Sequence, residues 1–293
     1  MTTYPRFFIG IDGGGTSCRG ILCWRDESVC LHATAGPANV LRHERAMESA
    51  FSVLHQLAAK ADLTVAGLAA GAIHLGMAGV LTKADAKRVE AAIESRFSFG
   101  AMSVSDDQVT TIEGALGGQR GAVAAIGTGS FVGRKSEVLR MIGGWGSIVG
   151  DQASGAYLGR RLLQECLLAH DGLRAQSKLS RDMMALYGDL PAEVVAFAHK
   201  ATPAEFASFA PNVVHAAADG DLIAVELLRE GAAYIARAID VLDWKADEPI
   251  CLVGGIGPQY RQWLPMAMAA AVVAPRGNAL DGALLMASKG GML

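Results

Sequence analysis

The chain has 293 residues, of which 51% are hydrophobic and 19% charged, a composition typical of a globular protein long enough for two domains. Its formal net charge of −3 at pH 7 excludes the basic surface that nucleic acid or an anionic membrane would require. No basic region followed by an apolar run opens the sequence, and the most apolar stretch, residues 65–81, is interrupted by glycines and His74, so neither a signal peptide nor a membrane span is expected.

The first predicted element is a buried strand over residues 7–11, which leads into Asp12, three consecutive glycines (13–15) and the hydroxyl residues Thr16 and Ser17. A second strand follows over residues 19–24, so this is a hairpin and not the strand-turn-helix of a dinucleotide or P-loop site. Glycines allow backbone N–H groups to approach an anion closely. Because Asp12 would repel a bare phosphate, we expect a hydrated Mg²⁺ between the two.

The rest of the first half alternates strands and helices in the order βββαβαβα. A capping box is predicted at Thr82 and Asp85, and Ser105-Asp106-Asp107 is expected to open a helix, with Asp106 as its cap. Three strands are expected over residues 7–35, and further strands over 68–77 and 102–104. Helices are expected over 43–60, 83–96 and 105–116.

The second half restarts the same design at Gly121. A strand leads into Gly127-Thr128-Gly129-Ser130, and a third apolar strand leads into Gly254-Gly255. Further expected elements are a strand over 138–142, a glycine-rich loop over 143–155, a helix over 157–169, helical segments over 173–243 separated by Pro191, Pro203 and Pro211, a helix after Pro258, and a terminal helix capped by Asn278.

The cysteines number five and are scattered, without a C-x-x-C pair or the spacing of a metal site. Most lie in apolar strand or helix patterns. We therefore expect all of them to be reduced core residues of a cytoplasmic protein.

The three glycine turns, in this order, resemble the phosphate-1, phosphate-2 and adenosine motifs of the actin, hexokinase and heat-shock ATPase superfamily. Within it the whole chain resembles the BadF/BadG/BcrA/BcrD-type ATPase family, in particular its N-acetylglucosamine and glucosamine kinase branch. The motifs that carry this resemblance are IDGGGTS, GPAN, GMAG, the SDD helix start, IGTGS, GGWGSIVGDQASG, LVGGIG and NALDGALLMA.

The resemblance implies an α/β fold of two ribonuclease H-like (actin-like ATPase) domains that close on substrate. The expected N-terminal domain comprises residues 1–117 plus 279–293. The expected C-terminal domain comprises residues 118–278 and carries a helical insertion over about 155–245. The resemblance also implies an ATP- and Mg²⁺-dependent kinase that phosphorylates an amino sugar, N-acetylglucosamine or glucosamine, at its 6-hydroxyl. The protein is expected to be a homodimer that binds neither nucleic acid nor membrane.

The same resemblance implies roles for individual residues. Asp107 would accept the proton of the sugar hydroxyl, and Asp12 would hold hydrated Mg²⁺. Asn39, Trp145, Asp151 and Ser154 would bind sugar together with Asp107. The nucleotide would be held by Gly13, Gly14, Gly15, Thr16, Gly127, Thr128, Gly129 and Ser130, and by Gly254 and Gly255 at the adenine, whereas His74 is expected to be structural.

Two departures from the family pattern leave the identity of the sugar substrate undecided. Gln152 and Ala153 stand where the family commonly has Glu-Gly, and Phe131 stands where the animal N-acetylglucosamine kinase has a polar residue. Alternatives are therefore a kinase for another sugar such as N-acetylmuramic acid, an ATPase that drives a conformational change in a partner enzyme, and a sugar-binding regulator without catalysis.

Overall fold

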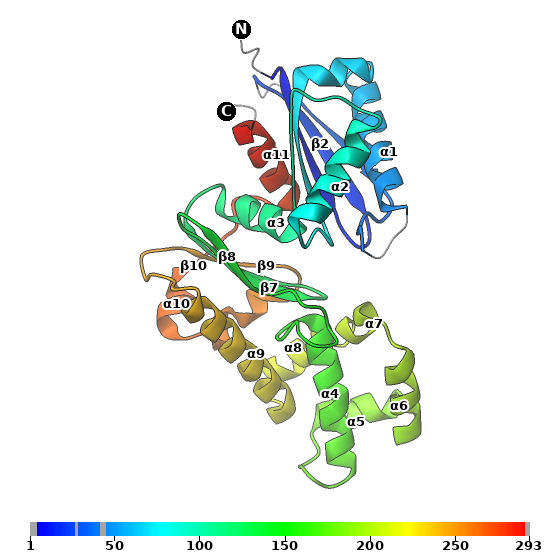
Figure 1. The fold of residues 1–293 in the computed structure, drawn as a ribbon. Helices are drawn as coiled ribbons and strands as arrows, with labels where there is room; N and C mark the ends of the chain where they lie inside the picture. Colours follow the sequence, from blue (N-terminus) through cyan, green and yellow to red (C-terminus); the bar gives the residue numbers. More distant parts are fainter. Residues whose placement is uncertain (1–4, 27–28, 42–44, 291–293) are drawn as a thin grey trace. The chain divides into compact units, whose positions relative to one another are not determined.

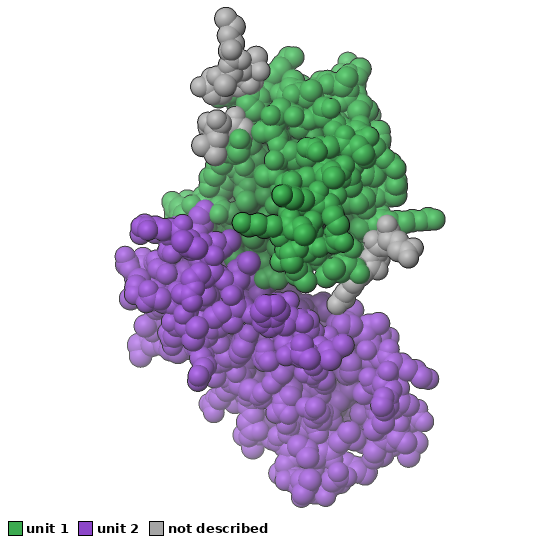
Figure 2. Space-filling view, viewed as in Figure 1, with its two compact units in different colours: residues 1–119, 275–293 green, residues 120–274 purple. Residues whose placement is uncertain are grey.

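The computed structural model describes residues 5–26, 29–41 and 45–290. The chain divides into two compact units, one formed by residues 1–119 with 275–293 and the other by residues 120–274, coloured separately in Figure 2. Within the described ranges, we find no helix with the length and apolarity that a membrane crossing requires.

The first unit is built on a five-stranded mixed sheet in the order β3-β2-β1-β4-β5. Three antiparallel strands, β1 (Phe7–Gly13), β2 (Cys18–Trp24) and β3 (Cys30–Ala35), continue into β4 (Gly71–Met77) and β5 (Ala101–Ser105), which run parallel to β1. Every residue of β4 is buried, as expected for a central strand covered on both faces.

Helices cover both faces of this sheet. On one face α1 (Ala46–Lys60) packs against β2, β3 and α2 (Lys83–Glu94), and on the other α11 (Ala279–Gly290) packs against β1, β4 and α3 (Asp107–Leu116) (Figure 1). Three predicted helix starts are confirmed: the Thr82–Asp85 capping box of α2, the Asp106 cap of α3 and the Asn278 cap of α11. The predicted start of the first helix of the chain, at residue 43, lies outside the described residues.

The C-terminal helix α11 approaches its neighbours at backbone-to-backbone distance. A Cβ added at Gly282 would lie 1.9 Å from the carbonyl oxygen of Thr110, and one added at Gly114 would lie 1.9 Å from that of Asn278. On the sheet side, a Cβ at Gly10 of β1 would lie 2.6 Å from the backbone nitrogen of Leu284. Glycine is therefore required at all three positions, and α11 belongs to the core of the first unit although it comes from the end of the chain.

The second unit repeats the sheet of the first. Its order is β10-β9-β6-β7-β8, with β6 (Gly121–Ile126), β7 (Ser130–Lys135) and β8 (Leu139–Gly143) antiparallel and β9 (Ile250–Val253) and β10 (Val272–Val273) parallel to β6. β6 takes the place of β1, so each unit has a central strand that ends in a glycine turn. The predicted α/β fold with an internal repeat is confirmed.

Helices make up most of the second unit. α4 (Gly155–His170) and α9 (Leu222–Val241) pack against each other, and shorter helices fill the sequence between them. These are α5 (Lys178–Ala185), α6 (Pro191–Lys200), α7 (Pro203–Ala207) and α8 (Ala210–Ala218), and the three predicted prolines lie in the first turns of the last three. The unit continues with η2 (Gly257–Trp263) and α10 (Met266–Ala271).

Two predicted elements differ in part from the structure. The strand expected from residue 68 begins only at Gly71, because the preceding residues form the 3₁₀ helix η1 (Ala66–Ala70). The helix expected after Pro258 starts as the 3₁₀ helix η2, in which Pro258 occupies the first turn, and the α-helix α10 follows only after Pro265.

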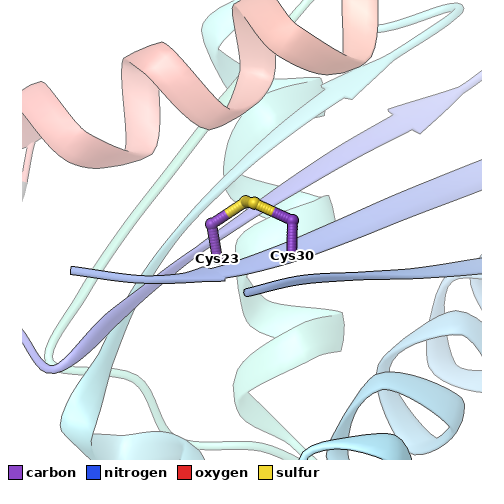
Figure 3. Close-up of a disulfide and its surroundings, with 2 residues drawn as sticks. All are labelled: Cys23 and Cys30. Carbon is purple, nitrogen blue, oxygen red and sulfur yellow. A yellow bond between two sulfur atoms is a disulfide. The ribbon is translucent and has the colours of Figure 1, made fainter. Parts of the chain in front are cut away.

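The prediction that all cysteines are reduced is also wrong. Figure 3 shows a disulfide between Cys23 of β2 and Cys30 of β3. The two residues are direct partners in the antiparallel register, with their Cα atoms 4.2 Å apart, so the pairing of the strands brings the thiols together. Cys18, Cys166 and Cys251 are buried free thiols. Cysteine usage therefore no longer supports a reducing compartment.

Candidate active site

The glycine turn of the first unit connects β1 to β2. Gly14 N–H donates to the carbonyl oxygen of Ser17 at 2.9 Å and closes a four-residue loop. An added Cβ at Gly15 would meet no atom within 4 Å, and its φ lies outside the left-handed region. The protein itself therefore does not require glycine there. Open space beside exposed backbone N–H groups is what a bound phosphate would use.

Two further loops are tied to this turn by backbone hydrogen bonds. Ala38 N–H donates to Gly14 O at 2.9 Å, and Ala78 N–H donates to Gly13 O at 2.8 Å. The Asn39 Oδ1 atom accepts from Leu41 N at 3.0 Å and lies 3.0 Å from where a Cβ of Gly79 would be. The predicted sugar ligand Asn39 is thus held beside the predicted phosphate turn in the same unit.

Asp12, at the end of β1, is 8% exposed and forms an ion pair with Arg19. Arg19 Nε lies 3.1 Å from Asp12 Oδ2, and its Nη2 contacts the same oxygen. The two are direct partners across the β1–β2 hairpin. Arg19 is a candidate functional residue that we did not select from the sequence. Its signal was the hairpin itself, because a loop of residues 14–17 places residue 19 opposite residue 12.

Asp106 and Asp107 lie at the junction of β5 and α3. Asp106 accepts a hydrogen bond from Gln108 N at 2.8 Å and caps the helix. Burial, then the charge and hydrogen bond of Asp106 and the charge of Asp12, raise the pKa of Asp107 to about 8. Burial also raises the pKa of Asp106. Three carboxyl groups thus interact electrostatically in the first unit. A perturbed carboxyl of this kind is typical of a functional site.

The second unit has its own glycine turn between β6 and β7. Gly127 N–H donates to Gly129 O at 2.9 Å, and an added Cβ at Gly127 would meet nothing within 4 Å. Gly254 follows β9 with a φ of +86°, and its added Cβ would lie 2.4 Å from Ile126 O, so this glycine is required for packing. Gly255, in contrast, faces open space. The predicted phosphate and adenine turns of this unit are therefore adjacent, and each offers an open glycine.

Asp151 connects the Gly127–Ser130 turn to the loop between β8 and α4. It is 6% exposed, lies in the left-handed region with φ +57°, and accepts a hydrogen bond from Gly146 N at 3.1 Å. Its Oδ2 atom lies 2.8 Å from where a Cβ of Gly129 would be. The loop is further held by Ser130 Oγ, which donates to Gln152 O at 2.6 Å. Asp151 and the turn thus lie in direct contact.

Trp145 and Ser154 differ sharply in their surroundings. Trp145 is 75% exposed, and the neighbouring Ile148 and Val149 are 87% and 78% exposed, so the loop presents an apolar surface that could receive the C–H face of a sugar. Ser154 is fully buried, and its Oγ accepts from Tyr157 N at 3.1 Å as the cap of α4. Its hydroxyl is used inside the protein, which favours a role in holding the loop.

Among the residues that the structure describes, no group of three or more His, Cys, Asp or Glu side chains is placed to enclose a metal ion. A hydrated Mg²⁺ needs only one or two carboxylates in addition to substrate phosphates. Asp12, with Asp107 nearby, supplies such a set. The Asp12 carboxylate therefore fits an ion that is held mainly by water and substrate phosphates.

Comparisons with known proteins find similarity to one ATPase family and to kinases of amino sugars. The sequence profile of the BadF/BadG/BcrA/BcrD ATPase family matches residues 9–283. The glucosamine kinase GspK of Vibrio cholerae is 32% identical over 285 residues, 97% of this chain and 96% of that protein. An N-acetylmuramic acid/N-acetylglucosamine kinase of Clostridium acetobutylicum is 27% identical over 78% of this chain and 76% of its own length. A crystal structure from Chromobacterium violaceum, assigned as an N-acetylglucosamine kinase, superposes with a TM-score of 0.81 at 35% identity, covering 96% of this chain and 99% of that one.

Proposed function

The chain belongs to the BadF/BadG/BcrA/BcrD ATPase family, and from this premise we propose that it transfers the γ-phosphoryl group of ATP to the 6-hydroxyl of glucosamine or N-acetylglucosamine. The observation that supports this most directly is the partly buried Asp107 carboxyl, whose pKa is raised to about 8 and which interacts electrostatically with Asp12 at the end of the strand that carries a glycine turn. An acidic group that can take a hydroxyl proton, beside a carboxylate suited to a cation, is the arrangement that phosphoryl transfer to an alcohol requires.

Phosphate binding is assigned to the two glycine turns. The turns Gly13 to Thr16 and Gly127 to Ser130 would bind the phosphates through their remaining backbone N–H groups and their threonine hydroxyls. The Ser130 hydroxyl is donated to Gln152 O and would hold the loop. The open, unstrained positions of Gly15 and Gly127 support this, because nothing in the protein itself requires glycine at either position. Gly254 and Gly255 would let the adenine approach the neighbouring turn.

Asp12 would hold a hydrated Mg²⁺, and Arg19 would exchange its contact with Asp12 for one with a phosphate. A bound ion there would neutralise charge on the phosphates and favour the ionised form of the nearby carboxyls. In the structure Arg19 balances the Asp12 carboxylate, with 47% of its own side chain exposed. A long, half-exposed guanidinium can rotate toward an incoming phosphate and bind it with two N–H donors. We therefore assign Arg19 to the phosphates when the nucleotide is bound.

Asp107 would accept the proton of the sugar hydroxyl as the phosphoryl group leaves ATP. Its raised pKa of about 8 means that the free protein at pH 7 holds mostly the protonated acid, so catalysis requires the ionised fraction. Asn39 would bind the same sugar through its amide. Trp145 and Asp151 would bind it in the second unit, the indole against C–H groups and the carboxylate against hydroxyls. Ser154 would hold the Asp151 loop.

The homodimer and the cytoplasmic location stay predictions. Light scattering on the purified protein would test the first.

A coupled ADP-release assay tests the proposed function. Purified protein is incubated with ATP and Mg²⁺ and with each of glucosamine, N-acetylglucosamine, N-acetylmuramic acid, glucose or no sugar. We expect ADP release chiefly with glucosamine or N-acetylglucosamine, with the phosphate located on the 6-oxygen by NMR, and no release from Asp107→Asn. ADP release that does not depend on any sugar would contradict the proposal and favour an ATPase that acts on a partner protein.

A further inference from the structure

His74 is a buried polar side chain that the proposed mechanism does not use. It lies in β4, is 1% exposed, and both of its ring nitrogens are hydrogen-bonded to serines of the neighbouring strand β5. Nδ1 is 2.8 Å from Ser103 Oγ, and Nε2 is 3.0 Å from Ser105 Oγ. Burial lowers the pKa of His74 to about 4, against the opposing charge of Glu113, so the imidazole is neutral at pH 7.

The donors and acceptors in this cluster can be assigned from one bond. The Ser105 hydroxyl has a single proton, which it donates to the carbonyl oxygen of Asp106 at 2.9 Å. Toward His74 it therefore accepts, which places the imidazole proton on Nε2. Nδ1 is then the acceptor for the Ser103 hydroxyl. The hydrogen bonds run in one direction, from Ser103 through His74 and Ser105 to the Asp106 carbonyl, and bonds aligned in this way strengthen one another.

The end of this chain is the peptide group that joins Asp106 to Asp107. Its carbonyl is held by Ser105, and its N–H, that of Asp107, is a hydrogen-bond partner of the Asp107 carboxyl. The next peptide group is held as well, because the hydroxyls of Thr110 and Thr111 each donate to the Asp107 carbonyl at 2.9 Å. Side-chain hydroxyls thus fix the peptide planes on both sides of the Asp107 Cα atom, and with them the direction of its side chain.

Strand pairing alone gives no reason for this cluster. β4 and β5 are already joined in parallel register, with His74 opposite Ser103. Burying an imidazole and hydroxyls costs more free energy than burying apolar side chains of the same size, even when every hydrogen bond is made. The feature that polar groups provide here, and apolar groups would not, is the directed hydrogen bond to the Asp106 carbonyl.

We propose that His74, acting through Ser105, is a positioning residue that fixes the Asp107 carboxyl for proton transfer from the sugar. This rests on the proposed function, in which Asp107 is the base. His74 touches neither substrate nor nucleotide in this assignment. Its imidazole serves as a rigid donor whose proton sets the orientation of the Ser105 hydroxyl.

Two matched pairs of variants test the proposal. Ser105→Ala removes the bond to the Asp106 carbonyl, whereas Ser103→Ala removes only the distal partner of the imidazole. His74→Gln keeps an N–H donor near the position of Nε2, whereas His74→Asn keeps a polar group only near Nδ1. Because small misplacements of a reacting group cost about 10²-fold in rate, we expect Ser105→Ala and His74→Asn to lower kcat by about 10- to 100-fold. The sugar KM should stay within about threefold, and Ser103→Ala and His74→Gln should keep kcat within about threefold of the wild type.

Thermal melting of all four variants shows which are folded, and kcat is expressed per folded protein. Equal kcat in Ser105→Ala and Ser103→Ala, or losses of kcat that follow melting temperature across the four variants, would overturn the positioning role while leaving the kinase assignment intact. A rise in sugar KM with unchanged kcat would overturn it too, because it would place the cluster in substrate binding. A wild-type protein without sugar-dependent ADP release would overturn both proposals.

Discussion

Replacement of Asp107 by asparagine should make the protein more stable while abolishing its activity. The pKa of Asp107 is raised from 3.8 to about 8, chiefly by burial. In the pH range between these values the folded protein keeps a proton that the unfolded chain releases. The contribution of this group to stability is therefore fully present below pH 3.8 and is lost as the pH rises toward 8. Asparagine has nearly the same shape and carries no charge, so it removes this loss.

The size of the effect follows from the shift. Each pH unit between the two pKa values lowers the free energy of unfolding by at most about 1.4 kcal/mol, which sets a ceiling of about 4 kcal/mol at pH 7. Asp106 keeps its own raised pKa after the substitution. Asparagine at position 107 therefore recovers only part of this ceiling. We expect a gain of about 2 kcal/mol at pH 7 to 8, which corresponds to roughly 4–8 °C in melting temperature for a unit of this size.

The assay is thermal unfolding of the wild type and Asp107→Asn at pH 5, 6, 7, 8 and 9, with ADP release measured on the same samples. Asp247→Asn, at an exposed position of the second unit, is the control for the loss of one negative charge. The advantage of Asp107→Asn should be small at pH 5, grow with pH and level off above about 8. An advantage that is the same at every pH, or a loss of stability throughout, would refute the assignment of a raised pKa to the Asp107 carboxyl.

The remaining predictions concern the same candidate site. Because the Asp106 charge contributes to the raised pKa of Asp107, Asp106→Asn should keep the helix cap and activity and move the acidic limb of the kcat/KM profile to lower pH; an unmoved limb would show that another group titrates. Asp12→Ala should abolish turnover while calorimetry shows sugar affinity within a few-fold of the wild type, whereas loss of sugar binding as well would make Asp12 a structural residue. Gly127→Ala should leave the melting temperature unchanged, because its Cβ meets no atom within 4 Å, and should weaken ATP binding by about tenfold, roughly 1.4 kcal/mol; unchanged ATP affinity would remove this turn from the nucleotide site. Glucosamine or N-acetylglucosamine should exceed glucose in kcat/KM by at least about tenfold, and equal values would indicate a general hexokinase.

Much of the fold follows from local patterns that the sequence displays openly. Apolar β-branched runs that end in glycines predict β1, β6 and β9 correctly, and the Thr82–Asp85 capping box marks the start of α2. Such patterns fail where tertiary packing determines the secondary structure of a segment. Leu68 extends the apolar run before β4, but it is buried from within a 3₁₀ turn and not from a strand.

The parts of the site that sequence analysis did not give depend on cross-strand register and on burial. The Asp12–Arg19 ion pair and the Cys23–Cys30 disulfide each join residues that are direct partners in antiparallel strands. Neither can be known until the length of the intervening turn is known. The raised pKa of Asp107 comes first from desolvation, a property of the folded surroundings that no spacing of residues in the sequence displays.

The close packing of α11 in the first unit has a consequence for synthesis on the ribosome. Domains usually fold in the order in which they emerge. Here the second unit is continuous over residues 120–274, whereas the first lacks a helix of its core until residues 279–290 have emerged. The unit translated second can therefore complete its fold first. A chain released early by a stalled ribosome would expose the α11 side of β1, the strand that carries Asp12, and would be open to degradation before it could bind nucleotide. The first unit can therefore complete its fold only after residues 279–290 have emerged.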